Sequence, residues 1–438
     1  MLARPRAAAA QATMALAAAC LLAAAPALAQ SGGTLRSKIP DLFRFGNCSA
    51  PLCLAGSLDA NTHGNHFIGA AASANTNVLE FLSNAVGVSL ASIPVSAASS
   101  GVTFTFVEGA PVRTASSAGP IFGERATTLG RNRLLVGTNV TAINFTTLRG
   151  RPLRDLHFNF THEDIEPNGL GDPGFENDVI SARVGLNLDL IATTAFITYG
   201  VFDKLDLSVS VPYVYTSMRG GSTLQVNPFT GATPHFFAGT SEDPVLRVAT
   251  DVAGSASGIG DVAVRAKVNL SQANLFALSL LADARLPTGD EENFLGAGNT
   301  SVRGLLIMSG QYGTFAPHAN IGYLRRTGEG TNNAFLATFG FDQMLSAWAT
   351  LAGELITESQ VGESALKLPG TVFYEEPYRR TVESTDIPNM RDNPINASLG
   401  MKFTTQNGVR LIVNGIFPMQ RAGLQPDAIW TAGLEYTF

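Results

Sequence analysis

The feature that constrains this chain most is a two-residue alternation of apolar and polar side chains, repeated in many segments after about residue 178. In one segment, Leu205, Leu207 and Val209 alternate with Asp206 and Ser208. Such alternation places one face of a β-strand in an apolar environment and the other in a polar one. Segments of roughly 10 to 13 residues suit a tilted strand that crosses hydrocarbon. The pattern favours an all-β, transmembrane antiparallel β-barrel over a soluble β-sandwich.

The candidate strands, counted back from Phe438, predict a barrel of about 14 strands, with about 12 to 16 as the accepted range. Short connections alternate with longer ones, as expected for periplasmic turns and external loops. The longer connections are expected at 217–257, 287–298, 360–394 and 419–427. The expected strands are 112–127, 133–146, 153–162, 178–199, 205–216, 258–270, 274–286, 299–310, 315–326, 333–342, 347–359, 394–406, 408–419 and 428–438.

The start of the chain predicts export. Arg4 and Arg6 precede an Ala- and Leu-rich stretch that ends at 27–29 with the pattern Ala-Leu-Ala, so 1–29 have the form of a cleavable signal peptide. No later apolar stretch is long enough for a transmembrane helix. We therefore expect a protein of the outer membrane of a Gram-negative-type bacterium, in contact with lipid and lipopolysaccharide.

The end of the chain predicts barrel assembly. Trp430, Tyr436 and Phe438 share one face of the last candidate strand, and the chain stops on an aromatic residue. This pattern resembles the C-terminal strand by which outer-membrane barrels are recognised by the barrel-assembly machinery. We expect these three residues to form the assembly signal.

Composition agrees with a barrel and excludes several other classes. Charged residues make up 15% of the chain, against about 25% in typical soluble domains, because half of all barrel strand positions face lipid. The formal net charge of −6 gives no reason to expect a nucleic-acid partner. Catalytic and phosphate-binding motifs are absent from the sequence, so we expect no enzyme activity, metal or cofactor.

The segment 30–110 differs from the rest because it is rich in Gly, Ser, Ala and Asn and shows little alternation. We interpret it as a periplasmic N-terminal plug or hatch, with the barrel in 111–438. Asn77 and Glu80 form a capping box that predicts a short helix at 78–86. The alternative is a helix packed on the periplasmic rim.

Two cysteines, Cys48 and Cys53, follow the predicted signal peptide. In an oxidising compartment they predict a short disulfide loop, and a two-cysteine metal site is the lesser alternative.

Several motifs resemble a known family. They are Gly258-Ile259-Gly260-Asp261-Val262 with Arg265 and Lys267, then Arg285-Leu286-Pro287-Thr288-Gly289-Asp290, and Tyr199-Gly200-Val201-Phe202-Asp203-Lys204-Leu205-Asp206. Over roughly 120–438 the chain resembles the outer-membrane barrels of the MetA-pathway phenol-degradation family, which are similar in architecture to the long-chain fatty-acid (FadL-type) transporters. The resemblance implies passive passage of hydrophobic or aromatic small molecules, with an N-terminal hatch in the lumen.

Charged residues on the polar faces are the candidates for the lumen, where they either meet a solute or form a salt-bridge network. These lumen-facing candidates are Arg183, Asp206, Asp261, Arg265, Lys267, Asp283, Arg285, Arg303 and Glu354. The preferred hypothesis is a monomeric transporter of hydrophobic solutes. The alternatives are a water-filled porin for polar solutes and a closed structural or surface barrel.

Overall fold

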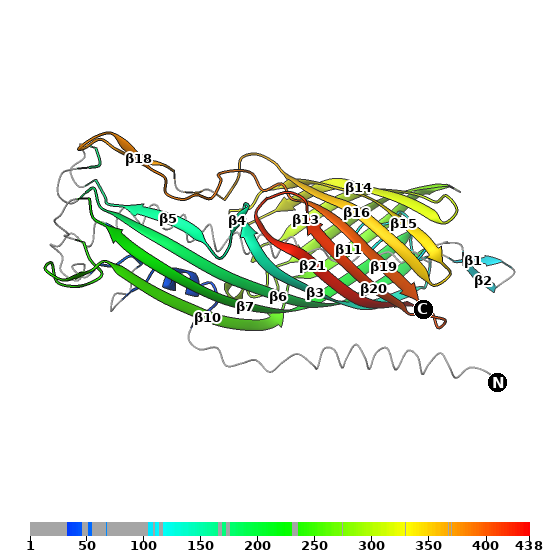
Figure 1. The fold of residues 1–438 in the computed structure, drawn as a ribbon. Coiled ribbons are helices and arrows are strands. Elements are labelled where there is room, and N and C mark those ends of the chain that lie inside the picture. Colours follow the sequence, from blue (N-terminus) through cyan, green and yellow to red (C-terminus); the bar gives the residue numbers. More distant parts are fainter. Residues whose placement is uncertain are drawn as a thin grey trace.

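The computed structural model describes residues 33–45, 51–54, 67, 104–107, 110–113, 117–164, 169–171, 176–229, 235–273, 275–328, 330–366, 368 and 370–438. Its main feature is a closed antiparallel barrel (Figure 1). Fifteen strands share one sheet, and three of them, β4, β5 and β10, lie outside the closed ring, which leaves twelve. The ring consists of β3 (Leu134–Leu148), β6 (Val179–Phe202), β7 (Leu205–Asn227), β11 (Val262–Gln272), β12 (Phe276–Leu286), β13 (Ser301–Gly310), β14 (Phe315–Arg326), β15 (Ala334–Ser346), β16 (Ala349–Gln360), β19 (Ile395–Thr404), β20 (Arg410–Pro418) and β21 (Leu424–Thr437). Pairing of β21 with β3 closes it.

The prediction of an all-β barrel is confirmed, and the strand number is twelve instead of fourteen. Segment 153–162 contains β5 (Leu156–Thr161), which pairs with the first part of β6 and lies outside the ring. Segment 112–127 is not a barrel strand, because it holds the end of β2 (Ala110–Arg113) and has no regular structure from Ser117 onward. The other twelve predicted segments each correspond to one strand of the ring.

The barrel has two different ends. Phe438 and the short turns 203–204, 311–314, 347–348 and 405–409 lie at one end, which we call the turn end. Beyond the opposite, loop end, β6 and β7 continue as a sheet extension, together with β5, β4 (Arg151–Pro152) and β10 (Arg247–Ile259) (Figure 1). The predicted loop 217–257 is therefore wrong in part, since it holds the rest of β7 and most of β10.

Along β6 the apolar face changes sides, and this change marks where the barrel wall becomes the extension. Near the turn end Ile191 and Ile197 point outward and are 45% and 52% exposed, while Thr194 and Thr198 are buried on the inner face. In the extension, the inner face instead carries fully buried Ile180 and its apolar neighbours. The outward face is apolar where lipid is expected and polar beyond it.

The inner face of the extension is covered by protein. Leu42 and Phe43, at and just after helix α2 (Lys38–Asp41), are buried there, and the Phe43 ring packs edge-on against Phe158 and Phe160 of β5. A Cβ at Gly220 would lie 2.9 Å from a methyl group of Leu186 and 3.2 Å from those of Leu42, so a side chain at this position would have to displace these leucines. The described parts of segment 30–110 that touch the barrel sheet thus pack at the loop end. The helix predicted at 78–86 and the signal peptide lie outside the described residues.

Minor elements complete the fold. They are the hairpins β1 (Phe104–Val107)–β2, β8 (Ala238–Gly239)–β9 (Pro244–Val245) and β17 (Val372–Tyr374)–β18 (Arg380–Val382), and the single-turn 3-10 helix η2 (Glu291–Asn293). None of the helices in the described part of the chain is long and apolar enough to span a membrane.

Candidate functional site

The candidate site is the barrel lumen at the level where the chain crosses it. Residues 117–131, which we call the strap, precede β3, have no regular secondary structure and are largely buried. Side chains from the inner faces of seven consecutive ring strands, from β7 through β11 to β16, hold the strap. The strap therefore crosses the lumen along one side of the barrel wall.

One end of the strap is held by a single carboxylate. Glu354 of β16 accepts hydrogen bonds from three successive backbone amides, those of Ile121 (3.0 Å), Phe122 (3.2 Å) and Gly123 (3.0 Å). Consecutive amides that converge on one anion form a strong, charge-assisted contact. Glu354 thus fixes both the position and the local backbone shape of the strap.

The other end is held in the same way by Asp206 of β7. Its two carboxylate oxygens accept from the Leu129 amide at 3.1 and 3.0 Å. Beyond it, Gly130 has a positive φ of 89°, and a Cβ on Gly200 would lie only 1.9 Å from the Gly130 carbonyl oxygen. Glycine at both positions lets the strap turn against β6 before β3 begins.

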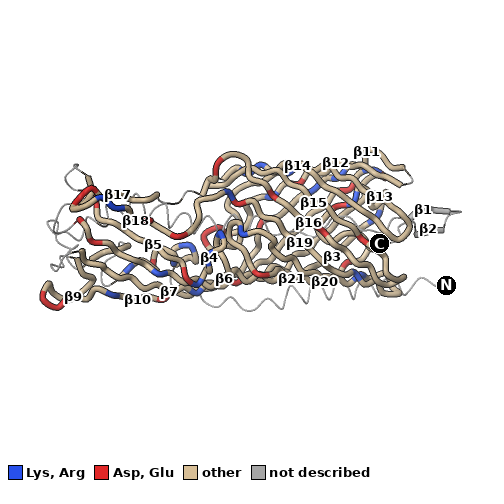
Figure 2. The backbone as a smooth tube through the Cα atoms, turned by 45° about the horizontal axis from the view of Figure 1, so that its top comes forward, with Lys and Arg blue, Asp and Glu red and all other residues tan. Residues whose placement is uncertain are grey.

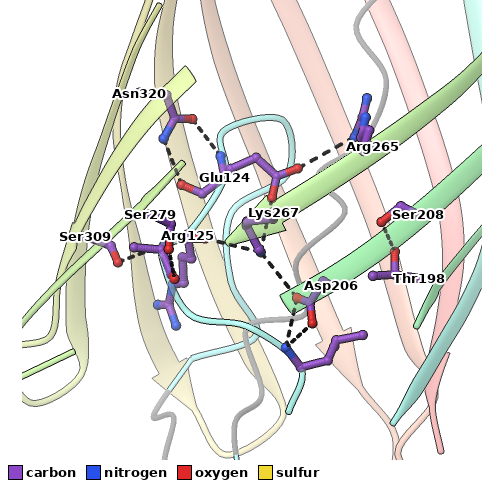
Figure 3. A network of polar contacts seen from close by, with 12 residues as sticks. Glu124, Arg125, Thr198, Asp206, Ser208, Arg265, Lys267, Ser279, Ser309 and Asn320 are labelled. Carbon is purple, nitrogen blue, oxygen red and sulfur yellow. Dashed lines mark hydrogen bonds and ion pairs between the residues drawn. The ribbon is translucent and has the colours of Figure 1, made fainter. Parts of the chain in front are cut away.

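Between these ends, buried acidic and basic side chains connect the strap to the barrel wall (Figure 3). Glu124 of the strap lies 3.6 Å from both Arg265 and Lys267 of β11, and Lys267 lies 3.8 Å from Asp206. All four side chains are at most 5% exposed. Buried charges at these distances compensate one another, so that removing one member leaves an uncompensated charge.

A second cluster anchors the strap to β15. Asp342 contacts the guanidinium of Arg125 and the hydroxyl of Ser117, both of which belong to the strap. The buried imidazole of His318 lies between this cluster and Glu354, 3.9 Å from an Asp342 oxygen and 3.7 Å from a Glu354 oxygen. The carboxylates of Asp342 and Glu354, which both anchor the strap, therefore lie on either side of one histidine.

A cavity of about 140 Å³ lies on the loop-end side of the strap. Phe122 and Glu124 of the strap form part of its wall, and the strands contribute both apolar and charged side chains. The charged ones are Asp283, Arg285, Arg303, Arg326 and Glu358. Charged residues are spread along the barrel strands as well as the extension (Figure 2).

The structure places seven of the nine predicted residues on the inner face of the barrel. Five are buried, and Arg285 and Arg303 are half-buried where they line the cavity. The five buried residues are Asp206, Arg265, Lys267, Asp283 and Glu354.

Arg183 was assigned to the wrong face. Its side chain is 66% exposed on the outside of the extension, where it pairs with Asp155 at 3.1 Å. The sequence pattern predicts that its apolar neighbours face lipid, but they form the protein core beneath the extension. When the apolar side of a strand packs on a protein core beneath the sheet, its polar side faces outward. The alternation in the sequence is the same as for a strand whose apolar side faces lipid.

Asp261 also lies away from the strap, at the irregularity between β10 and β11. Its carboxylate accepts from the amides of Gly289 (3.1 Å) and Ala297 (2.8 Å). Asp261 therefore holds the connection between β12 and β13 against the barrel.

The strap and its residues Glu124 and Arg125 were not predicted from the sequence. A signal was present, because Gly119, Pro120 and Gly123 are poor residues for the interior of a central strand. Asp342 and Asn320 were also missed; the Asn320 amide exchanges two hydrogen bonds with the Glu124 backbone, at 2.7 and 2.9 Å.

Three further expectations concern the disulfide, the C-terminal strand and metal sites. Cys53 is disulfide-bonded, while Cys48 lies outside the described residues. Trp430 and Phe438 point outward and are 56% and 46% exposed. Within the described ranges, no group of three or more His, Cys, Asp or Glu side chains is arranged to hold a metal ion.

Comparison with known proteins gives one family and a set of barrels. Residues 171–365 match the model of the family described as "Putative MetA-pathway of phenol degradation", which confirms the resemblance over that part of the chain. No curated protein matches the sequence.

Solved structures similar to this chain include an outer membrane channel from Pseudomonas putida F1, with 10% identity, a TM-score of 0.39 and coverage of 72% of this chain and 98% of that one. A FadL homologue from Pseudomonas aeruginosa has 12% identity and a TM-score of 0.31 over 70% of this chain and 89% of its own. The toluene transporter TodX of P. putida has 10% identity and a TM-score of 0.30, with the same coverages.

Proposed function

We propose that this protein is an outer-membrane channel for the passive passage of hydrophobic or aromatic small molecules. The observation that carries the proposal is the strap, which occupies the lumen and leaves beside it a small cavity with a partly apolar wall. The closed ring and its outward apolar face support a membrane location. The matched family is described by a phenol-degradation pathway, and TodX is a toluene transporter, so both descriptions agree with such a solute.

The proposed orientation places Phe438 and the short turns in the periplasm and the extension outside the cell. External loops of barrels are longer than periplasmic turns, which supports this choice. In this orientation residues 33–45 lie on the external side, and the strap takes the role of plug that the sequence argument gave to a periplasmic segment.

A porin and a closed structural barrel are the competing functions. A porin needs a continuous aqueous path, whereas here buried ion pairs and hydrogen bonds fix the strap inside the ring. A closed structural barrel would share the strap but would not affect the uptake of any compound.

Two measurements distinguish these functions. In a planar bilayer the refolded monomer is expected to show low or flickering conductance, and a large steady conductance would favour the porin. In cells, the lipopolysaccharide leaflet is the barrier to apolar compounds, so a deletion strain should take up limiting toluene more slowly than the complemented strain. Equal uptake by the two strains would refute the transporter and leave the closed barrel.

A further inference from the structure

We propose that the cavity above the strap is a binding site for a small organic monoanion with an apolar body of about one ring, such as an aromatic carboxylate. This inference rests on the proposed function and names the class of solute that the lumen holds. The cavity volume of about 140 Å³ is close to that of an engineered apolar cavity of about 150 Å³ that binds benzene. A single ring with one small head group matches this size.

One wall of the cavity is suited to an apolar ring. Leu305, Leu324, Leu336 and Ile356, from four successive strands, line it together with Phe122 of the strap. Burying an apolar ring against such a wall is favourable in proportion to the area removed from water. The strap therefore contributes directly to the site.

Next to this apolar surface the cavity is suited to an anionic head group, because Arg303 faces Leu324 across β13 and β14 and lies two residues from Leu305. Arg303 of β13 lies 3.2 Å from Asp283 on the facing position of β12, and Arg265 contacts the same carboxylate. Arg285 lies two residues from Asp283 on the same face of β12 and also lines the cavity. Asp283 thus lies among three guanidinium groups, one of which, that of Arg265, also lies 3.6 Å from Glu124.

Arg303 and Asp283 both line the cavity, and the arginine is the more accessible of the two. The side chain of Arg303 is 26% exposed, whereas that of Asp283 is 2% exposed. Among the described residues, the Arg303 Nε has no hydrogen-bond partner. A guanidinium in this setting is a preferred partner for a carboxylate, which it can bind through two parallel hydrogen bonds.

The other acids near the cavity are already compensated. Glu358 is paired with Arg326 at 2.8 Å, and Glu124 lies between Arg265 and Lys267. The carboxylate of Asp261, on the far side of Arg285, accepts two backbone amides. Arg303 itself is paired with Asp283, a carboxylate that it shares with Arg265, so its half-buried guanidinium can take a bound anion as a second partner.

Binding of sodium benzoate to the refolded full chain, measured by isothermal titration calorimetry beside toluene, tests the proposal. Benzoate is expected to bind more tightly than toluene, because both fill the apolar wall and only benzoate reaches the arginines. Arg303→Gln should weaken benzoate binding roughly tenfold or more, the effect of losing a charge-assisted hydrogen bond, and should weaken toluene binding far less. Arg183→Gln, the same change at an exposed arginine outside the barrel, is the matched control.

Equal affinity for benzoate and toluene, or equal benzoate affinity of wild type and Arg303→Gln, would overturn the site. Arg285→Gln provides the same test where Arg303→Gln fails to give the folded, heat-modifiable form on a gel. Failure of the proposed function is distinguishable. If the protein still speeds toluene uptake in cells but shows no preference for benzoate, only the anion site is lost, whereas no effect on uptake removes the transporter itself.

Discussion

Replacement of Glu354 by Ala should release one end of the strap and open the lumen. The Glu354 carboxylate accepts three backbone amides at 3.0–3.2 Å and is itself only 6% exposed. Alanine leaves those three buried N–H groups without an acceptor. The β16 backbone pairings with β15 and β19 do not involve this side chain, so the ring should remain closed.

The size of the effect follows from the bonds lost. Hydrogen bonds to a charged group contribute about 1.5–3 kcal/mol each. Because neighbouring bonds are not additive, we take roughly 3–6 kcal/mol for the three together. Because about 1.4 kcal/mol corresponds to a tenfold change in an equilibrium constant, the population with an undocked strap should rise roughly a hundredfold or more. Glu354→Gln keeps one acceptor oxygen and should have an intermediate effect.

Single-channel recording in planar bilayers measures the change as a higher frequency of open events. Glu358→Gln is the matched control, because Glu358 lies on the same strand and pairs with Arg326. Heat-modifiable migration on a gel checks that each variant is folded. If Glu354→Ala folds and its open-event frequency equals that of the wild type, the strap is not the barrier, and the reasoning from its anchors is refuted.

Three other substitutions test the rest of the structure. Arg149→Ala removes a buried side chain that contacts Asp392 at 2.9 Å and the Pro388 carbonyl at 3.2 Å. Loss of its cationic partner leaves Asp392 uncompensated, which should destabilise the fold by about 3–5 kcal/mol and speed proteolysis of loop 360–394. The control Arg151→Ala, at a half-exposed arginine, should not have this effect. Gly220→Val should clash with Leu42 and loosen residues 33–45 from the extension, seen as faster cleavage there; unchanged cleavage would count against that packing. Phe438→Ala should reduce the amount of assembled barrel in the outer membrane, whereas Phe373→Ala in the exposed β17 hairpin should not; equal amounts would remove Phe438 from the assembly signal.

The sequence alone determined the class of fold and most of the barrel wall. Alternation along a strand is a local property, since neighbouring side chains point to opposite faces, so it located segments such as 205–216 and 395–403 without knowledge of their partners. It also placed Arg265, Lys267 and Asp283 on the polar face of one hairpin, where the structure has them buried. Lipid requires an apolar outward face on every strand, so the pattern can be recognised in each strand separately.

Only the tertiary structure decided what each apolar face meets. The alternation of 180–190 is the same whether its apolar side contacts lipid or a protein core, and the core in the extension comes from residues near 33–45. For the same reason Arg183 could not be assigned to a face from its neighbours. The strap depends on even more distant partners, because Ile121 and Glu354 are 233 residues apart. Local periodicity carries no information on contacts of that range, so the closure of the ring determines where the strap docks.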